Sequence, residues 1–287
     1  SAESRRQPPH APDRADAMLI FRNDHPATAA DLALPALVND GHFTTMQVRG
    51  GAVQGLELHL QRLADAHRTL FSRDLDTARV RADCAAAITA SGLADATLRV
   101  TVHPGEPDPT VLVSLASPAH PGTGGLRLKS FAYVRVLPDV KHVGTFPLLH
   151  YRRLARAAGC DDALFVTTDG LVCEGSVWNL ALWDGSAVIW PQGPALRGTR
   201  EQLLQREFRR AGVAQQARTV LLDELPALAG ISCNSRGVQP LASVDGREMG
   251  DPASLLELAA AASTRIAWDL LDVGERRAPT VAGTASL

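Results

Sequence analysis

The stretch DDALFVTTDGLVCEGSVWN, residues 161–179, decides how this chain folds. Its apolar run ALFV predicts a buried strand, TTDG a hairpin turn, and LVCEG the returning strand. Glu174 would then point inward rather than to solvent. A buried carboxylate is costly unless a cation or a proton-sharing group accompanies it. Glu174 therefore needs a partner inside the fold, and the question is which group shares its proton.

Around this hairpin, length and composition predict two domains in a mixed α/β fold. A chain of 287 residues exceeds the size at which a single core usually keeps growing. The clearest linker is PAHPGTGG, residues 118–125. We expect a flexible tail over residues 1–17, an N-terminal α/β domain over 18–125 and a C-terminal domain over 126–287.

Periodicity predicts the main elements of both parts. Helical spacing of apolar residues marks two helices in the first part, and alternating or continuous apolar runs mark strands. In the first part we expect a strand at 42–48, helices within 52–71 and 77–91, and strands at 97–105 and 110–117. In the second part we expect a strand at 126–136, a helix at 147–159, the hairpin, and two further helix-and-strand alternations.

Composition favours a small-molecule ligand. The chain is 45% hydrophobic and 21% charged with a formal net charge of -2, which gives no nucleic-acid or membrane-surface signature. No apolar run approaches the roughly 20 residues of a membrane span, and the N-terminus lacks signal-peptide order, so we expect a cytoplasmic protein. The four cysteines and nine histidines show no metal-ligand spacing. We expect reduced, structural cysteines and no metal.

The lysines are unusually few. Of 29 Lys and Arg residues, only Lys129 and Lys141 are lysine. Arg stays protonated, whereas a desolvated Lys can lose its proton and attack a carbonyl to form a Schiff base. A lysine kept in such a chain is a candidate for that role. The alternative is that Lys129 points outward from a strand and Lys141 only ends a loop.

A buried carboxylate and a Schiff-base lysine are two of the three groups that pyridoxal phosphate needs. The third is a phosphate cradle. In PALRGTREQLL, Gly198 and Thr199 precede a predicted helix, and a helix start offers free N–H groups and partial positive charge to a dianion. The sequence contains no Rossmann glycine fingerprint and no phosphate-loop motif, which argues against nicotinamide and ATP enzymes.

Five motifs in order resemble the class IV aminotransferases, the fold type IV enzymes that use pyridoxal 5'-phosphate. They are GHFTTMQVRGGAVQGLELHLQRLADAHRTLF, VKHVG, DDALFVTTDGLVCEGSVWN, PALRGTREQLL and ISCNSRGVQPLASVDG, within residues 18–248. The family includes branched-chain and D-amino-acid aminotransferases and 4-amino-4-deoxychorismate lyases. The resemblance implies a smaller N-terminal α/β domain and a larger, barrel-like C-terminal α/β domain. It also implies a homodimer.

The resemblance also implies roles for single residues. Lys141 would be the Schiff-base lysine and Glu174 the partner of the pyridine nitrogen. The remaining cofactor-binding residues would hold the phosphate: Arg62, Gly198, Thr199, Arg200, Asn234 and Ser235. Arg99 matches a position that binds substrate carboxylate in branched-chain enzymes, although a solvent-facing strand arginine is the alternative. Thr44 and Thr45 could place a hydroxyl near the cofactor, or could only pack.

Some residues depart from the family pattern, and these departures bear on which member of the family the chain resembles most. Phe146 stands where branched-chain enzymes carry a tyrosine that touches the cofactor's phenolic oxygen. The first motif and ISCNS look closer to the lyases. Of the histidines, we expect only His142 near the cofactor.

Three functions follow as hypotheses. The first is a class IV aminotransferase that moves an amino group between a small amino donor and a 2-oxo acid through Lys141. The second is a 4-amino-4-deoxychorismate lyase that releases pyruvate and 4-aminobenzoate. The third is a non-catalytic cofactor-binding member of the family.

Overall fold

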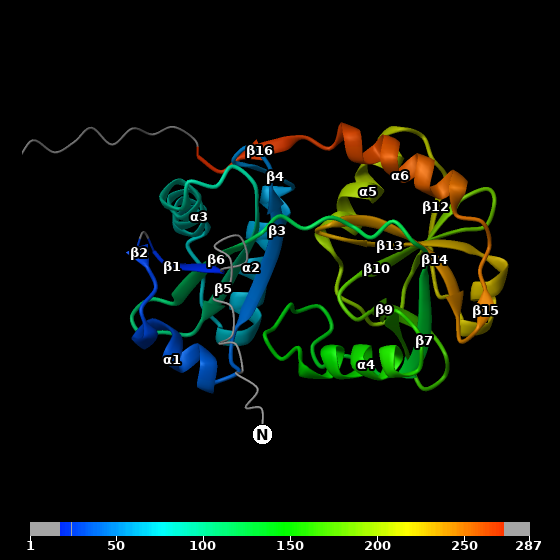
Figure 1. Ribbon diagram of the computed structural model, residues 1–287, viewed down its shortest axis with the longest axis horizontal. Coiled ribbons are helices and arrows are strands. Elements are labelled where there is room, and N and C mark those ends of the chain that lie inside the picture. The colour runs from blue at the N-terminus through cyan, green and yellow to red at the C-terminus, as the bar shows by residue number, and fades with distance from the viewer. Residues whose placement is uncertain (1–17, 24, 273–287) are drawn as a thin grey trace, which may run out of the picture.

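The computed structural model describes residues 18–23 and 25–272, so the tail predicted over residues 1–17 lies outside the described residues. Its strands form two large sheets that lie side by side, with the first half of the chain in one and the second half in the other (Figure 1). Helices pack on both sheets. The mixed α/β class predicted from the sequence is therefore confirmed.

The first sheet contains five strands in the order β2-β1-β6-β5-β3, all paired antiparallel. Its strands are β1 (Leu19–Arg22), β2 (His25–Pro26), β3 (His42–Val48), β5 (Ala96–His103) and β6 (Thr110–Ala116). Three helices accompany it: α1 (Ala29–Leu37), α2 (Leu56–Phe71) and α3 (Thr77–Ser91). Apolar side chains from α2, α3 and the strands form one buried cluster.

The second sheet contains nine strands and curls around its own apolar cluster (Figure 1). Eight follow the order β12-β11-β10-β13-β14-β7-β8-β9, and β15 pairs with β14. The strands are β7 (Leu126–Ala132), β8 (Asp162–Val166), β9 (Val172–Gly175), β10 (Asn179–Trp183), β11 (Val188–Pro191), β12 (Gln215–Arg218), β13 (Ala229–Asn234), β14 (Gly237–Val244) and β15 (Arg247–Glu248). The helices are α4 (Phe146–Ala157), α5 (Thr199–Arg210), the short 3₁₀ helix η1 (Leu222–Ala227) and α6 (Ala253–Arg265).

Two segments cross between the halves. The first is the predicted linker, residues 118–125, which joins β6 to β7. The second leaves α6 and ends in β16 (Trp268–Leu270), which pairs antiparallel with β4 (Ala52–Gln54) in the first half. The described chain thus returns to the half in which it began. The domain limits at residues 125 and 126 stay a prediction.

Most predicted elements are present, and the differences have local causes. The strand over 42–48 and the helix over 77–91 have the predicted bounds. The helix expected within 52–71 begins only at Leu56, because β4 and Gly55, which has a left-handed φ of 69°, precede it. Helix α1 was not predicted. None of its residues is buried, and every position except Asp31 is apolar, so no apolar stripe is set off from a polar face.

The hairpin at 161–179 forms as predicted, and tight packing fixes its end. Strands β8 and β9 pair antiparallel, and the Glu174 side chain is buried. A Cβ atom on Gly175 would lie 2.0 Å from Cε2 of Trp178, so only glycine fits beside this indole. The Trp178 Nε1–H donates to Asp162 (3.1 Å), which also accepts from the Ser176 hydroxyl (2.6 Å). Close packing on Gly175 and the hydrogen bond to Asp162 therefore fix the position of the Trp178 indole.

We predict that Gly175→Ala destabilises the fold by about 1–3 kcal/mol, because the added methyl group overpacks the site and must displace the indole. Chemical denaturation measures the loss, and near-ultraviolet circular dichroism reports the indole. Gly124→Ala is the matched control, because a Cβ atom there meets nothing within 4 Å. Equal stability of the two variants would contradict this account of Gly175.

Candidate functional site

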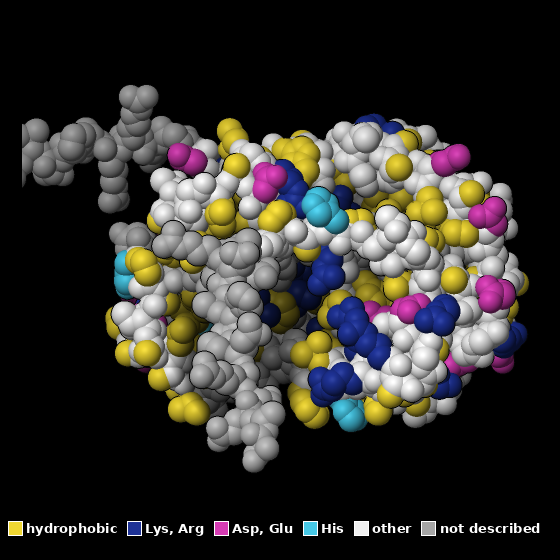
Figure 2. Space-filling model, viewed as in Figure 1, with side chains coloured by type: hydrophobic (Ala, Val, Ile, Leu, Met, Phe, Trp, Pro, Cys, Tyr) yellow, Lys and Arg dark blue, Asp and Glu magenta, His cyan; other side chains and the backbone are white. Residues whose placement is uncertain are grey.

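A cleft of about 460 Å³ lies where the two sheets meet. Strands β3 and β5 and helix α2 line one side, and β9, β10, the start of α5 and the β13–β14 turn line the other. Lys and Arg side chains gather around the hollow between the halves (Figure 2). The cleft contains nearly all of the predicted site residues: Arg62, Arg99, Lys141, Glu174, Gly198, Thr199, Arg200, Asn234 and Ser235.

Lys141 lies in the loop between β7 and α4 and reaches into this cleft. Its carbonyl oxygen accepts a hydrogen bond from the Phe43 amide (2.9 Å), and its Nζ lies 4.8 Å from the centre of the Phe43 ring. Burial, together with the nearby charges of Arg62 and Arg135, lowers the pKa of Lys141 to about 7. The amine can therefore lose its proton near neutral pH.

Lys129 has the opposite surroundings. Its Nζ lies 2.9 Å from Asp245 Oδ1, and the side chain is partly exposed. The hydrogen bond to Asp245 raises its pKa. Lys129 therefore stays protonated, and of the two lysines only Lys141 is suited to attack a carbonyl.

Glu174 extends from β9 into the cleft and has a cationic partner. Arg135 donates from Nε and Nη2 to Glu174 Oε1 at 3.1 and 2.9 Å, and from Nη2 to Oε2 at 3.1 Å. The Leu196 amide donates to Oε2 at 3.3 Å. Burial raises the pKa of the Glu174 carboxyl, while Arg135 and the Leu196 amide oppose this rise.

The start of α5 and the side of α2 form a polar end of the cleft. Three buried donors there have no hydrogen-bond partner among the described residues: Arg62 Nε, Thr199 Oγ1 and Arg200 Nε. A Cβ atom on Gly198 would lie 2.1 Å from Asn179 Oδ1, so the backbone passes closely at this point. Unsatisfied donors beside a helix N-terminus suit a phosphate dianion. The residues present therefore fit the phosphate of the predicted cofactor.

Thr44 does not line the cleft. Its side chain is fully buried, and its hydroxyl contacts His59 Nδ1 (2.7 Å) and Arg62 Nη2. Thr45, the next residue of β3, lines the cleft instead. A direct role of Thr44 in substrate binding stays a prediction. In the structure, the Thr44 hydroxyl accepts a hydrogen bond from Arg62, which lines the cleft.

Arg99 lines the cleft from β5. Its guanidinium carbon lies 3.7 Å from the centre of the Phe43 ring, and its Nε donates to Thr101 Oγ1 at 3.0 Å. Burial lowers its pKa. Arg99 is half-buried and faces the cleft, while its role toward a substrate carboxylate stays a prediction.

The expectation for the histidines needs correction. His142 lies outside the cleft lining: its Nε2 contacts the Val136 carbonyl (2.9 Å) and its Nδ1 accepts from the Gly144 amide (3.1 Å). His59 lines the cleft, 3.3 Å from Arg62 Nη2. Burial lowers its pKa far below the ordinary value, so His59 is neutral and can accept hydrogen bonds. The sequence signal for His59 was its position three residues before Arg62 on a helix, which places the two side chains on the same face.

The part of the chain that the structure describes has no group of three or more His, Cys, Asp or Glu residues that could hold a metal ion. Among the same residues, no helix is both long enough and apolar enough to cross a bilayer.

Comparison with known proteins gives one family and several similar structures. Residues 41–244 match the family described as Amino-transferase class IV. No curated protein matches the sequence. A hypothetical aminotransferase from Mycobacterium tuberculosis, in its apo form, is 25% identical with a TM-score of 0.73, covering 85% of this chain and 98% of that one.

Two further structures share the fold at lower identity. A putative 4-amino-4-deoxychorismate lyase from Legionella pneumophila is 18% identical with a TM-score of 0.73, covering 80% of this chain and 92% of that one. The T.th. branched-chain amino acid aminotransferase, complexed with N-(5'-phosphopyridoxyl)-L-glutamate, is 19% identical with a TM-score of 0.75, covering 87% of this chain and 93% of that one. The fold type expected from the resemblance is confirmed.

We predict that pyridoxal phosphate attaches to the unloaded protein faster as pH rises through about 7, because the lowered pKa of Lys141 frees its amine there. Absorbance after rapid mixing measures the rate, and borohydride with peptide mapping identifies the lysine. Lys129→Arg should keep both rate and midpoint. A midpoint near that of an ordinary lysine, or label on Lys129, would contradict the assignment.

We predict that Glu174→Gln lowers both stability and rate. Removing one partner of a buried ion pair costs about 3–5 kcal/mol. Without the Glu174 carboxylate, the pKa of the cofactor's ring nitrogen should fall by a few units, which should also slow the reaction by roughly two powers of ten. Thermal melting and the half-reaction with an amino donor measure the two effects.

Glu207→Gln is the matched control for this variant. Glu207 is buried and paired with Arg210 (2.5 Å), but neither residue lines the cleft. It should lose stability without losing rate. A folded Glu174→Gln variant that reacts as fast as the wild type would show that Glu174 only anchors the hairpin.

Proposed function

We propose that this chain, which belongs to the class IV aminotransferase family, moves an amino group from a small amino donor to a 2-oxo acid. The observation that carries the proposal is that Lys141, Glu174 and the unsatisfied donors at the start of α5 line one cleft. The family is one of pyridoxal-phosphate enzymes, so the predicted cofactor and the enzymatic nature of the chain are confirmed.

The roles of the residues follow from their surroundings. Arg62, Thr199 and Arg200 would hold the phosphate, because their buried donors have no other partner among the described residues. When bound, pyridoxal phosphate supplies an electron sink. Glu174 would favour a protonated ring nitrogen, and Arg135 holds its carboxylate in place. Lys141 would hold the cofactor through its amine, and once the substrate's amino group displaced it, the freed Nζ would move a proton at the substrate's reacting carbon.

The proposal includes the homodimer and the cytoplasmic location expected from the sequence. Large apolar side chains are exposed on the loop before α4 and on α4 itself: Val136, Leu137, Phe146, Leu149 and Leu154. Exposed apolar side chains of this kind favour burial against another protein surface. A net charge of -2 gives little repulsion to oppose self-association.

The lyase remains the second candidate, because the fold is shared with a putative 4-amino-4-deoxychorismate lyase. We predict that the cofactor-loaded protein transfers amino groups from small donors to pyruvate or 2-oxoglutarate. The same preparation is given aminodeoxychorismate and scored for 4-aminobenzoate and pyruvate. Lys141→Arg, which keeps the charge but cannot attack a carbonyl, should abolish either activity.

The outcomes separate the two candidate activities. Amino transfer that depends on Lys141 supports the proposal. Release of 4-aminobenzoate without amino transfer identifies the lyase instead. Cofactor uptake with neither activity would contradict both.

A further inference from the structure

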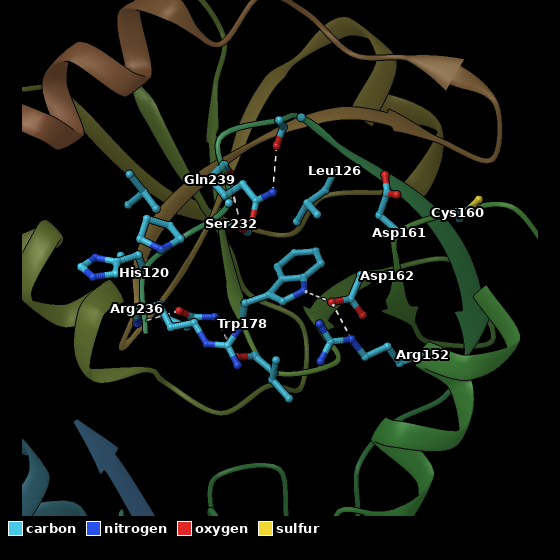
Figure 3. Close-up of a pocket in the computed structure, with 18 of the residues that line it drawn as sticks. His120, Leu126, Arg152, Cys160, Asp161, Asp162, Trp178, Ser232, Arg236 and Gln239 are labelled. Atoms are coloured by element: carbon cyan, nitrogen blue, oxygen red, sulfur yellow. Dashed lines mark hydrogen bonds and ion pairs between the residues drawn. The ribbon is translucent and has the colours of Figure 1, made fainter. Parts of the chain in front are cut away.

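Two crossings of the chain fix how the halves of the molecule meet. The first, the linker at residues 118–125, lines a cavity of about 410 Å³ inside the curled sheet, where Gln239 Nε2 donates to the Gly124 carbonyl at 2.8 Å (Figure 3). The second is the strap, residues 266–272, which follows α6 and contains β16 (Figure 1).

The strap is bound to the first half along its length. Gln54 Nε2, from β4, donates to the Ile266 carbonyl at 3.1 Å, and β16 then pairs with β4. Arg81, from α3, donates to the carbonyls of Leu270 and Leu271 at 2.7 and 3.1 Å. The Leu271 side chain is buried in the apolar cluster of the first half. The strap therefore has a fixed place beside β4, just before α2 begins.

The strap caps α2. The N-cap residue of this helix is Gly55, which has no side chain to accept a hydrogen bond from the first turn. Asp269, which pairs with Val53 across β16 and β4, supplies the missing acceptor: its Oδ2 accepts from the Leu56 amide at 3.2 Å. A carboxylate at a helix N-terminus also interacts favourably with the helix dipole.

The cap comes from another segment because position 55 leaves no room for a side chain. A Cβ atom on Gly55 would lie 2.9 Å from Leu203 Cδ1 and 3.3 Å from Thr199 Cγ2. Both of these residues belong to α5, so the start of α2 lies against the first turns of α5. Gly55 has in addition a left-handed φ of 69°, which favours glycine.

The two helices that meet there carry the two sides of the phosphate end of the cleft. Arg62 lies on α2, and Thr199 and Arg200 lie on α5. The three buried donors of these residues have no hydrogen-bond partner among the described residues. Charge-assisted hydrogen bonds to phosphate are short, so a shift of α2 by about 1 Å would take Arg62 out of reach.

We propose that Asp269 is a positioning residue for the phosphate end, because its cap fixes α2, and with it Arg62, against the start of α5. This inference rests on the proposed function, which assigns Arg62, Thr199 and Arg200 to the phosphate. Asp269 does not line the cleft, so it acts through α2. Its own negative charge disfavours a nearby phosphate, so removal of the charge alone would tighten phosphate binding.

The test compares pyridoxal phosphate with pyridoxal, which has the same ring and aldehyde but no phosphate. Absorbance titration gives the dissociation constant of each, and their ratio measures the contribution of the phosphate. Asp269→Ala should bind pyridoxal phosphate roughly tenfold more weakly and pyridoxal as tightly as the wild type. Asp269→Asn keeps an oxygen that can accept from the Leu56 amide, so it should keep the ratio.

Asp76→Ala is the matched control. Asp76 caps α3 and accepts from the Arg79 amide at 2.9 Å, but no residue of α3 lines the cleft. This variant should keep the ratio, whereas a general loss of stability would weaken both ligands alike. If Asp269→Ala does not fold, Arg81→Gln replaces it, because it loosens the strap, and the ratio should fall in the same direction.

An unchanged ratio in Asp269→Ala or its replacement, or an equal fall in Asp269→Asn, would overturn the inference. A wild type that does not prefer pyridoxal phosphate to pyridoxal would do the same. Amino transfer by the wild type is measured alongside. The expected fall in ratio without any amino transfer would refute the proposed function and not the role of Asp269.

Discussion

The arrangement of the cleft depends on the buried ion pair between Arg135 and Glu174. Removing both charges from water is expensive, and the cost is offset only when geometry and further hydrogen bonds are good. Here three Arg–Glu hydrogen bonds and the Leu196 amide satisfy the carboxylate. The pair joins the segment after β7 to β9 and to the residues before α5. Those three segments carry Lys141, Glu174 and the Gly198–Arg200 helix start.

The excess of cations makes the cleft incomplete without an anionic ligand. Like charges in a desolvated space repel one another, and burial lowers the pKa values of Arg62, Arg99 and Arg200. Three buried donors without partners among the described residues add to this cost. A ligand that brings negative charge relieves both effects, so binding and stability are linked. The same repulsion helps to free the Lys141 amine.

Local patterns predicted the hairpin with Glu174 and the helix start at Gly198–Thr199, whereas the family resemblance implied the other cleft residues: Arg62, Arg99, Arg200, Asn234 and Ser235. Glu174 follows an apolar alternation, and Gly198–Thr199 precedes a periodic helix. The choice between Thr44 and Thr45 depends on register instead. Thr45 pairs with Arg99 across β3 and β5, and neighbours across strands share a face, so Thr45 faces the cleft with Arg99. Arg135 could not be predicted, because β7 ends at Ala132 and strand alternation no longer fixes its direction.

The use of arginine for nearly every cation in the cleft has a chemical consequence. Arginine keeps its charge in proteins, so six of the seven cationic side chains are fixed positive charges at any ordinary pH. Lys141 alone among them can lose its proton near pH 7, because its pKa is lowered to about 7. The arginines can thus bind anions and shift the lysine without competing with it as nucleophiles. Because only Lys141 among these cations can become a neutral amine, attack on a carbonyl is confined to a single atom, Lys141 Nζ.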